Sequence, residues 1–443
     1  MKTQTIPKKH IVVIGGGFAG LNFITHLFGN PYYRVTLVDK NNYNYFTPLV
    51  YQVATGFLEP SSISYPFRKL FRGRDVAFRM AALRRIEPET NTVYLSDDGA
   101  LSYDVLVLAA GSSTNFFGNE SIRKNAFALK GIDDALAMRN ALIKTLELAS
   151  VEKDPAERAR LLTIVVAGGG PTGVEVAGML AEMKKHILGS EYPELKGAGG
   201  AIHIVEGSPH LLEPMSDKSH VAAYLALHEL DVHIQLNTRV VYSEAGQVHL
   251  SDGTLIAAHT LIWAAGVVAN AFEGIDGQSR GRGQRMITDA HNRVQGYQNI
   301  YAIGDGSIQF GDPAYPNGHP QLAQPAIQQG KHLAANLVRA ARGRAMQPFV
   351  YFDRGDMAII GRTKAVADLF KHKLHLGGFL GLLSWLFIHV ASLVNYNNKI
   401  KTLYNWTVAY LTRDQALRMI FRPGTPEHRG RTKQAVPREN AVV

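Results

Sequence analysis

The stretch HIVVIGGGFAG, residues 10–20, decides the fold of the N-terminal part of this chain of 443 residues. Its apolar run IVVI is typical of a strand that is buried on both faces of a parallel sheet. Gly15, Gly17 and Gly20 follow with GxGxxG spacing, and the next apolar segment, RVTLVD, ends in Asp39. The glycines allow a tight turn, a close backbone approach to a pyrophosphate and close helix–strand packing, and the acid can accept hydrogen bonds from a ribose. These features predict a dinucleotide-binding βαβ unit.

A second stretch, LTIVVAGGGPTGVEVAGMLAEM at residues 162–183, repeats the pattern with Gly168, Gly170 and Gly173. The next apolar strand, AIHIVE, ends in Glu206. An acid at this place favours the free 2′-hydroxyl of NAD(H) and repels the 2′-phosphate of NADP(H). Two such cradles predict two bound dinucleotides, which we interpret as FAD in the first cradle and NAD(H) in the second.

Three further strand ends fit bound dinucleotides. The segments YDVLVLAAGSST and HTLIWAAGVVAN each end an apolar strand in Ala-Ala-Gly, at Gly111 and Gly266, where small residues let a cofactor lie against the chain. The segment NIYAIGDGS places Asp305 after a third strand and before a predicted helix at residues 321–341. An acid here can hold the hydroxyls of a flavin's ribityl chain, and the helix start can face the electron-rich edge of the reduced ring.

The composition excludes several classes of redox protein. The chain has no cysteine, so it has no disulfide framework, no cysteine-ligated zinc or iron–sulfur cluster and no redox-active dithiol. Disulfide reductases and sulfide:quinone oxidoreductases need such cysteines and are excluded, and no metal site is expected. The net charge of +10 suggests an anionic partner, such as lipid headgroups, nucleic acid or a phosphate-bearing cofactor, although a solvated basic surface needs no partner. The N-terminus lacks the apolar region of a secretory signal.

The apolar stretch LGGFLGLLSWLFIHVASLV, residues 376–394, contains no Lys, Arg, Asp or Glu. A membrane-spanning helix needs about 20 mostly apolar residues, so length alone permits a span. Lysines flank both ends about equally, which leaves no asymmetry to orient a span. We therefore expect a helix that lies in the plane of an anionic membrane surface. The supporting residues are a small or polar docking face at Gly377, Gly381, Ser384, Ala391, Ser392 and Asn395, and interfacial aromatics at Trp385, Tyr396, Tyr404, Trp406 and Tyr410.

Three stretches carry a family resemblance: NNYNYFTPLVYQVATG, AQPAIQQG and the apolar C-terminal region from residue 377. On them the chain resembles the type II NADH dehydrogenases, the single-subunit, non-pumping NADH:quinone oxidoreductases of the two-dinucleotide flavoprotein family. The resemblance covers residues 8–422. It implies ping-pong hydride transfer from NADH through flavin N5 and two-electron reduction of a membrane quinone to quinol. It also implies a homodimer bound peripherally, as a monotopic protein, to the cytoplasmic face of the inner or plasma membrane.

The resemblance assigns roles to three side chains. Gln324 and Gln328 match the family's AQxAxQ motif, share one helical face and can donate hydrogen bonds to a quinone, although two ordinary polar residues at a helix start fit the same spacing. Glu175 is placed near the nicotinamide and the flavin as a proton relay or ring-orienting group, and an acid that merely suits the helix dipole is the alternative. The chain departs from the family at Asn44 and Thr47, where relatives often carry His and Gln. Further cofactor contacts are expected at Phe18, Ala19, Lys40, Thr47, Leu83, Pro171, Thr172 and Ala323.

The predicted fold is α/β, with two doubly wound Rossmann-like domains, the NAD domain inserted in the FAD domain, and a C-terminal membrane-associating helical region. The predicted boundaries are 1–120 and 290–346 for the FAD domain, 121–289 for the NAD domain, 347–422 for the anchoring region and 423–443 for a polar tail. Two other functions stay open at this point. One is an NADH-dependent reductase of a small electron-transfer protein, which the apolar C-terminal region argues against. The other is a basic, NAD-responsive, nucleic-acid-binding signalling flavoprotein, for which no recognition motif is present.

Overall fold

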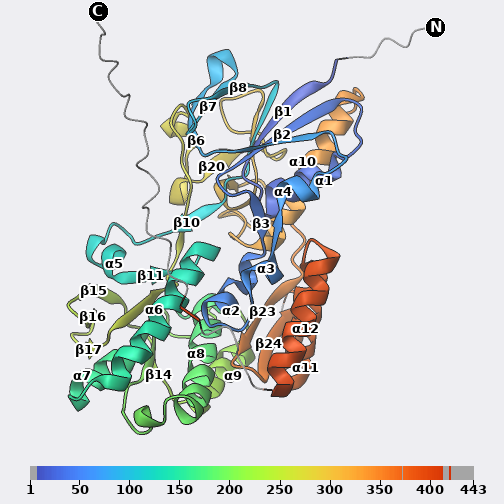
Figure 1. The fold of residues 1–443 in the computed structure, drawn as a ribbon. Coiled ribbons are helices and arrows are strands. Elements are labelled where there is room, and N and C mark those ends of the chain that lie inside the picture. Colours follow the sequence, from blue (N-terminus) through green and yellow to red (C-terminus); the bar gives the residue numbers. More distant parts are fainter. Residues whose placement is uncertain (1–6, 372, 413–418, 421–443) are drawn as a thin grey trace, which may run out of the picture.

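The computed structural model describes residues 7–371, 373–412 and 419–420, and Figure 1 shows their arrangement. The polar tail predicted at 423–443 lies outside these residues. Two parallel sheets form the body of the molecule, and a small antiparallel sheet with two helices completes it.

The first sheet has five parallel strands, and its central strand is the apolar run of the first glycine motif. In spatial order the strands are β21 (Ile300–Ala302), β9 (Val105–Leu108), β1 (Lys9–Ile14), β2 (Tyr33–Asp39) and β5 (Val76–Met80). Ile11 and Val13 pack with helices α1 (Phe18–His26) and α10 (Ala323–Ala341). Val12 and Ile14 pack on the opposite face, in a cluster that includes the meander β6 (Leu83–Glu87), β7 (Thr92–Leu95) and β8 (Ala100–Ser102). Burial on both faces explains why β1 is apolar at four consecutive positions.

The second sheet has the same construction. Its parallel strands are β11 (Ala126–Ala128), β18 (Thr260–Trp263), β12 (Ile164–Ala167), β13 (Ile202–Val205) and β14 (Val232–Gln235). Helices α6 (Ile132–Val151), α8 (Pro171–Ser190) and α9 (Asp217–Glu229) contribute to the core on one face. The other face packs against the meander β15 (Val240–Glu244), β16 (Gln247–Leu250) and β17 (Leu255–Ala257). The helices α5 (Glu120–Asn125) and α7 (Pro155–Leu162) lie at the edge of this part (Figure 1).

A two-stranded ribbon joins the two parallel sheets. Strand β10 (Ser112–Thr114) leaves the first sheet after β9, and β19 (Val267–Ala269) returns after β18, and the two pair antiparallel. The second sheet is therefore inserted between β9 and β21 of the first, which confirms the predicted α/β fold of two doubly wound units. The residue numbers predicted for the domain boundaries stay a prediction.

A short segment between β2 and β5 fills the junction of the two units. It contains β3 (Tyr43–Tyr45), η1 (Thr47–Leu49), α2 (Val50–Ala54), α3 (Pro60–Ile63), β4 (Ser64–Pro66) and α4 (Phe67–Leu70). Its first part, residues 41–56, is one of the stretches that carry the family resemblance, and in the structure the segment lies against α6, α8 and the C-terminal helices.

The C-terminal region forms a third layer. Strands β23 (Gly355–Ile360), β24 (Lys364–Leu369) and β25 (Leu374–Gly377) make an antiparallel sheet, followed by α11 (Gly378–Ser392) and α12 (Tyr396–Thr412). Figure 1 shows β23 and β24 between α8 and α9 on one side and the red helices α11 and α12 on the other. Gly178 of α8 permits this contact, because a Cβ there would lie 2.5 Å from the backbone nitrogen of Gly361.

The docking face predicted for the apolar stretch is wrong at three of its six positions, while Gly381 is buried as predicted and Ser384 and Asn395 are half-buried. The buried residues of α11 are Gly381, Leu382, Trp385 and His389, whereas Gly377, Ala391 and Ser392 are exposed. The surface of β24 accepts large side chains, and only Gly381 must be small, because its Cβ would lie 2.5 Å from the carbonyl oxygen of Ala365. Trp385 and Trp406, expected at an interface, are fully buried, while Tyr396 and Tyr404 are exposed as predicted.

The outward face of α11 is strongly apolar. Its exposed side chains are Phe379, Leu380, Leu383 and Phe387, and Phe387 is 75% exposed. The helix has 15 residues. Within the described ranges, no helix has the length and apolar character that a membrane crossing requires.

Candidate active site

In the glycine turn of the first cradle, Gly17 is the one position of the motif where an added Cβ would not collide with the protein. Gly15 has φ +97°, and a Cβ on it would lie 2.4 Å from the carbonyl oxygen of Ala109. A Cβ on Gly20 would lie 2.0 Å from the carbonyl oxygen of Gly15. A Cβ on Gly17 would meet no described atom within 4 Å, so this backbone faces open space at the start of α1. The free N–H groups of the helix start and this open space suit a pyrophosphate, so the residues fit a bound dinucleotide.

The second cradle reproduces this geometry at the start of α8. Gly168 has φ +108°, and its Cβ would lie 2.7 Å from the carbonyl carbon and oxygen of Ala264. A Cβ on Gly173 would lie 1.8 Å from the carbonyl oxygen of Gly168, and one on Gly170 would meet nothing described within 4 Å. Pro171 and Thr172 follow as exposed first residues of the helix, where a proline costs no hydrogen bond.

The acid at the end of the second strand is held in the same way in both cradles. Asp39 accepts hydrogen bonds from the backbone N–H groups of Gly16 (2.7 Å) and Asn41 (2.8 Å). Glu206 accepts from the N–H groups of Gly169 and Ser208. Burial raises the pKa of Asp39, and the opposing effect of the two N–H groups and Lys40, which lower it, is smaller. Each carboxylate has unused lone pairs, which are available to ribose hydroxyls.

The turn after β21 gathers several predicted contacts. Asp305 accepts a hydrogen bond from the hydroxyl of Ser112 (2.6 Å), the residue after Gly111, and the Lys130 ammonium lies 3.7 Å from the same carboxylate oxygen. Gln329 of α10 accepts from the N–H of Gly304 (2.6 Å) and so fixes the turn. The sequence motif points to the neighbouring Gln328 and gives no signal for Gln329.

The other predicted cofactor contacts lie at element ends. Ala19 is buried in the first turn of α1. It lies beside Gly304, because a Cβ built on Gly304 would lie 3.0 Å from the Cβ of Ala19. Gly266 has φ +154° between β18 and β19. The remaining positions are Phe18 at the start of α1, Lys40 after β2, Thr47 at the start of η1, Leu83 at the start of β6 and Ala323 at the start of α10. Their roles as cofactor contacts stay a prediction.

Asn44 has a structural role that the sequence did not reveal. Its buried amide donates to the carbonyl oxygen of Gly16 at 2.7 Å, so it ties β3 to the first glycine turn. A residue that departs from the family pattern thus stabilises the cradle in another way.

Glu175 lies on the second turn of α8 and is sealed from water by the C-terminal sheet. Its carboxylate accepts a hydrogen bond from the N–H of Ile359 of β23 at 3.4 Å. Burial raises the pKa of Glu175 to about 8, while the Ile359 N–H and the indole of Trp385 pull it back. The Trp385 N–H itself makes no hydrogen bond of normal geometry with any described group. A carboxyl with a pKa of about 8 is mostly protonated at pH 7, and burial is the main cause.

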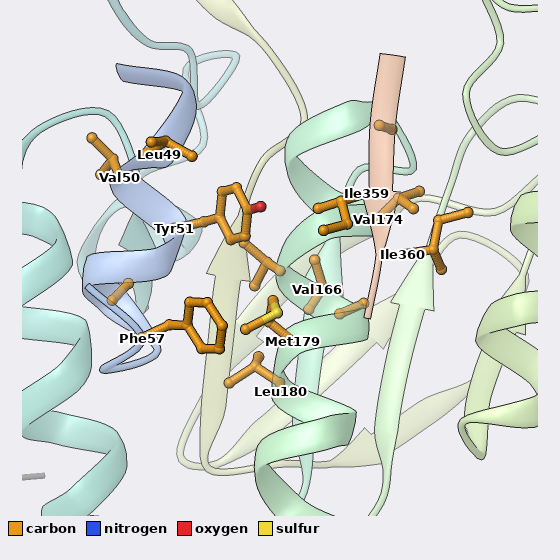
Figure 2. Packing of buried hydrophobic residues seen from close by; sticks show 14 of the residues in the cluster. Leu49, Val50, Tyr51, Phe57, Val166, Val174, Met179, Leu180, Ile359 and Ile360 are labelled. Carbon is orange, nitrogen blue, oxygen red and sulfur yellow. The ribbon is translucent and has the colours of Figure 1, made fainter. Parts of the chain in front are cut away.

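Tyr51 and Gln52 of α2 connect Glu175 to helix α12. Figure 2 shows Tyr51 pointing from α2 toward α8 and Ile359. Its hydroxyl accepts a hydrogen bond from Gln52 (3.0 Å), and Gln52 accepts one from the indole N–H of Trp406 (2.8 Å). Burial, and then the nearby Glu175, raise the pKa of Tyr51 well above its ordinary value. This set of buried groups was not found from the sequence, because Tyr51 and Gln52 meet Glu175 and Trp406 through contacts between segments that are distant along the chain.

His389 closes the other side of this region. It stacks on Trp385, with ring centroids 3.8 Å apart, and its Nδ1 bonds to the carbonyl oxygen of the same residue. Burial lowers the pKa of His389 to about 4, so the ring stays neutral. Phe46 packs edge-on against it at 6.0 Å. The region around Glu175 is thus walled by uncharged groups.

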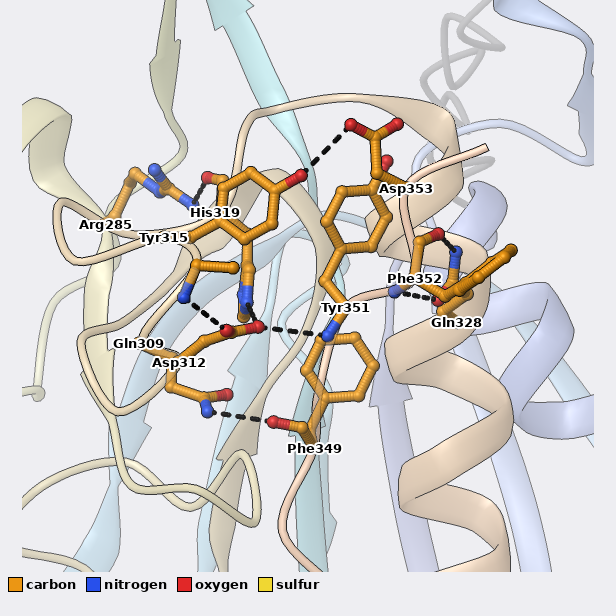
Figure 3. Close-up of polar contacts among 11 residues, drawn as sticks. Arg285, Gln309, Asp312, Tyr315, His319, Gln328, Phe349, Tyr351, Phe352 and Asp353 are labelled. Atoms are coloured by element: carbon orange, nitrogen blue, oxygen red, sulfur yellow. Dashed lines mark hydrogen bonds and ion pairs between the residues drawn. The ribbon is translucent and has the colours of Figure 1, made fainter. Parts of the chain in front are cut away.

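The two glutamines of the AQxAxQ motif bind one neighbouring segment. Gln324 donates from Nε2 to the carbonyl oxygen of Gly355 (2.8 Å). Gln328 donates to the carbonyl oxygen of Phe352 (2.8 Å) and accepts from the N–H of the same residue (3.0 Å), as Figure 3 shows. Each Nε2 keeps a second N–H, and the buried Oε1 of Gln324 has no partner among the described residues.

A buried polar cluster holds the same segment from the other side (Figure 3). Asp312 accepts from the N–H of Tyr351 (3.1 Å) and bonds to the ring of His319 (3.0 Å). Gln309 donates to the carbonyl oxygen of Phe349 (3.2 Å). The segment leads into β23, which carries Ile359 over Glu175, so the glutamines and this cluster together position the cover of the carboxyl.

Comparison with known proteins shows the family to which this chain belongs. A family model described as pyridine nucleotide-disulphide oxidoreductase matches residues 9–330. A type II NADH:quinone oxidoreductase, Ndh, of Mycobacterium tuberculosis (strain ATCC 25618 / H37Rv) is 34% identical over 430 residues, which cover 93% of this chain and 90% of that protein. This chain belongs to the type II NADH:quinone oxidoreductases. A second member from that organism, NdhA, is also 34% identical, over 92% of this chain and 88% of its own length.

The solved structures add support for the fold. The structure of NDH2 from Plasmodium falciparum in complex with NADH superposes with a TM-score of 0.85 at 21% identity, over 94% of this chain and all of that one. The family membership of the chain confirms the resemblance inferred from sequence motifs, and with it the expectation of a flavin and NADH.

Proposed function

We propose that this chain oxidises NADH and reduces a membrane quinone, with FAD in the first cradle and NAD(H) in the second. The observation that supports this most directly is the meeting of four elements around Glu175. The helix of the second cradle carries the carboxyl, α2 and β23 enclose it, and α11 and α12, with their exposed apolar faces, lie directly behind. A bound flavin would accept a hydride from NADH and pass two electrons to the quinone.

The protein's part in the proposed reaction is to hold the two nucleotides and to supply a proton. Gly17 and Gly170 leave room for the pyrophosphates, and Asp39 and Glu206 face the riboses. Quinone reduction consumes two protons, and Glu175 carries one at neutral pH because its pKa is raised to about 8. An acid with a pKa near the working pH is well suited to general acid catalysis.

Gln324 and Gln328 are proposed as the polar contacts of the quinone. Both amides are held in place by the backbone of residues 352–355, and each has a remaining N–H to donate. The free Oε1 of Gln324 can accept from a quinol hydroxyl. Gln324 bonds to Gly355 and Glu175 to Ile359, so both side chains contact strand β23, at positions four residues apart.

The outward faces of α11 and α12 are proposed to rest on anionic lipid. Phe387 of α11 and Tyr404 of α12 are mostly exposed, and Lys399 and Lys401 supply positive charge. Large exposed apolar patches mark interaction surfaces, and lysines beside them favour anionic headgroups. We place the protein on the cytoplasmic face of the inner or plasma membrane, as a homodimer, because the family resemblance implies both.

The catalytic proposal is tested by steady-state assays of the purified, FAD-loaded chain with NADH. Oxidation of NADH should proceed with a soluble quinone and give quinol in a 1:1 ratio. Oxidation that needs a thiol acceptor, an added metal or a small electron-transfer protein would contradict it.

The membrane proposal is tested with Phe387→Ser and a matched control, Val151→Ser, on the exposed surface of α6. Removing one phenyl ring from lipid costs about 2 kcal/mol, so Phe387→Ser should bind vesicles more than tenfold more weakly. Val151→Ser should bind as the unmodified chain does, and both variants should keep full turnover with a soluble quinone. Equal vesicle binding by the two variants would remove α11 from the membrane face.

A further inference from the structure

A polar cleft opens where the first dinucleotide unit meets the start of α12. It encloses about 490 Å³ between the β4–α4 segment and the first turns of α12. Its walls are fastened by buried hydrogen bonds: Asn398 donates to the carbonyl oxygens of Ser62 (3.0 Å) and Ser64 (2.9 Å), and Thr402 donates to that of Ser62 (3.2 Å). Figure 1 shows α12 running beside α3 at this place. The cleft is therefore a fixed feature of the packing.

The cleft has the chemistry of an anion site. Lys69 of α4 and Lys401 of α12 line it from opposite walls, together with hydroxyl and amide side chains such as Ser64 and Asn397. Neither ammonium forms an ion pair with a carboxylate in the described part of the chain. Among the carboxylates beside the cleft, Glu59 accepts from the lining hydroxyl of Ser61 (3.1 Å), and Asp133 and Asp39 lie near the lining Tyr43 and raise its pKa after burial does. Two lysines facing several neutral hydrogen-bond donors suit a phosphate.

The mouth of the cleft is continuous with the apolar face of α12. Ile400 lines the cleft and is 52% exposed. Tyr396 and Leu403 lie four residues before and three residues after it, on the same side of the helix, and both are exposed. A ligand in this cleft would therefore have its charged part between the lysines and an apolar part along α12.

We propose that this cleft binds the phosphate headgroup of one anionic phospholipid, whose acyl chains run along Ile400 and Leu403. This inference rests on the proposed membrane face and adds to it a single specific headgroup site. Its volume is within the range of small-molecule sites, and the combination of charge inside and apolar surface outside matches a lipid better than a free anion.

The experiment measures binding of the full FAD-loaded chain to vesicles of phosphatidylcholine, with and without phosphatidylglycerol. Lys69→Gln and Lys401→Gln are compared with Lys373→Gln, an exposed lysine in the turn between β24 and β25 that does not line the cleft. Each cleft variant should bind phosphatidylglycerol vesicles about fivefold more weakly, the loss expected for one lysine near a headgroup. Their binding to pure phosphatidylcholine, their flavin content and their turnover with soluble quinone should stay unchanged. The Lys373→Gln control should lose clearly less.

The possible results separate the two proposals. A chain that binds both vesicle types equally overturns the headgroup site and the preference of α11 and α12 for anionic lipid, and leaves only their apolar contact with the membrane standing. A chain that binds neither overturns both. Equal losses in the cleft variants and in the control show general surface charge, and displacement by glycerol phosphate at matched concentration shows a free phosphate site; either result overturns the proposal. Loss of flavin from the cleft variants would show that the cleft belongs to the cofactor instead.

Discussion

The two dinucleotide cradles have nearly the same local geometry but different surroundings. Gly15 and Gly168 take positive φ angles, and a Cβ on the third glycine of either motif would collide with the carbonyl oxygen of the first. In both cradles, the acid at the end of the second strand accepts hydrogen bonds from two backbone N–H groups. One belongs to the glycine directly after the first glycine of the motif, and the other belongs to the residue two positions after the acid. These features follow from the glycine spacing, which acts over a few residues.

The differences begin two residues past the third glycine. In the first cradle this position is Asn22, which donates to the carbonyl oxygen of Phe18 in its own helix at 2.9 Å. In the second cradle it is Glu175, buried under β23. Helix α1 is covered by α10, where Gly330 allows close approach, and α8 is covered by β23, where Gly178 does the same. The glycine turns of the two cradles are thus alike, whereas the covering element decides which side chain of the helix is buried beside it.

The largest effect is expected where the third glycine of each cradle is replaced. Gly20→Ala and Gly173→Ala each place a Cβ within 2.0 Å of a backbone oxygen that cannot move without opening the turn. Gly20→Ala should yield protein without flavin and without activity. Gly173→Ala should keep its flavin absorbance but raise the KM for NADH more than a hundredfold. The upper end of the cost of overpacking is about 3 kcal/mol, and a loss of binding free energy of that size corresponds to this factor. Flavin spectra and NADH kinetics measure both.

Gly20→Ala and Gly173→Ala are expected to differ in flavin content. Loss of flavin from both variants, with circular dichroism unchanged, would mean that the assignment of FAD and NAD(H) to separate cradles is wrong.

The second effect concerns the position at which the cradles differ. Glu175→Gln should lower turnover about a hundredfold, the lower range for loss of a general acid. Activity of the unmodified chain should fall as pH rises through about 8, when Glu175 loses its proton, and the variant should lack this step. Asn22→Ala, at the matched position of the first cradle, should keep near-normal turnover because the hydrogen bond that it removes lies within helix α1.

The raised pKa of Glu175 also makes a prediction about stability. The folded carboxyl keeps its proton up to about pH 8, while the unfolded one loses it near 4.5, so the folded state binds more protons between these values. The free energy of unfolding should therefore fall as pH rises from 4.5 to 8, by at most about 1.4 kcal/mol per pH unit from this group. Glu175→Gln should flatten that slope in urea unfolding. An unchanged slope would show that the carboxyl is not buried as described.

The third effect tests the covering elements. Gly330→Ala places a Cβ 2.3 Å from the carbonyl oxygen of Ala19, and Gly178→Ala places one 2.5 Å from the nitrogen of Gly361. Overpacking of this kind costs about 1–3 kcal/mol, partly offset by up to about 1 kcal/mol of helix propensity. Both variants should lose about 1–2 kcal/mol of stability in urea unfolding. Gly330→Ala should also lose flavin, and Gly178→Ala should keep flavin but turn over about tenfold more slowly, because β23 moves away from Glu175. Identical functional losses would contradict the separate roles of the two covers.

The sequence predicted the parts of the fold that are set locally. Glycine spacing, apolar strands and the acid after each second strand fix the cradles within residues 10–39 and 162–206, so their residues could be named in advance. The helical spacing of Gln324 and Gln328 placed them on one face, but it could not show that Gln329 is the buried one that holds Gly304. That distinction depends on how α10 packs on the turn after β21, which is a contact between distant segments.

Hydropathy could not assign the faces of the C-terminal helices. An all-round apolar helix such as α11 has no polar side to mark which face is exposed, and Trp385 is buried because β24 offers it a surface. Trp406 is also buried, and its indole N–H donates to Gln52. These two residues are more than 350 positions apart, so no local pattern can reveal the contact.

The smallest effect concerns the acids, where the cradles are most alike. Glu206→Gln keeps the size of the side chain and an oxygen that can accept from Gly169, so the fold and flavin content should be retained. It removes the negative charge that repels a 2′-phosphate. The ratio of kcat/KM for NADPH to that for NADH should rise about tenfold, equivalent to about 1.4 kcal/mol of discrimination. Asp39→Asn, the matched change in the first cradle, should weaken flavin retention and leave this ratio unchanged, because Asp39 does not meet the substrate nucleotide. A shift of the ratio by Asp39→Asn, or none by Glu206→Gln, would mean that the carboxylate of the second cradle does not read the ribose of the substrate.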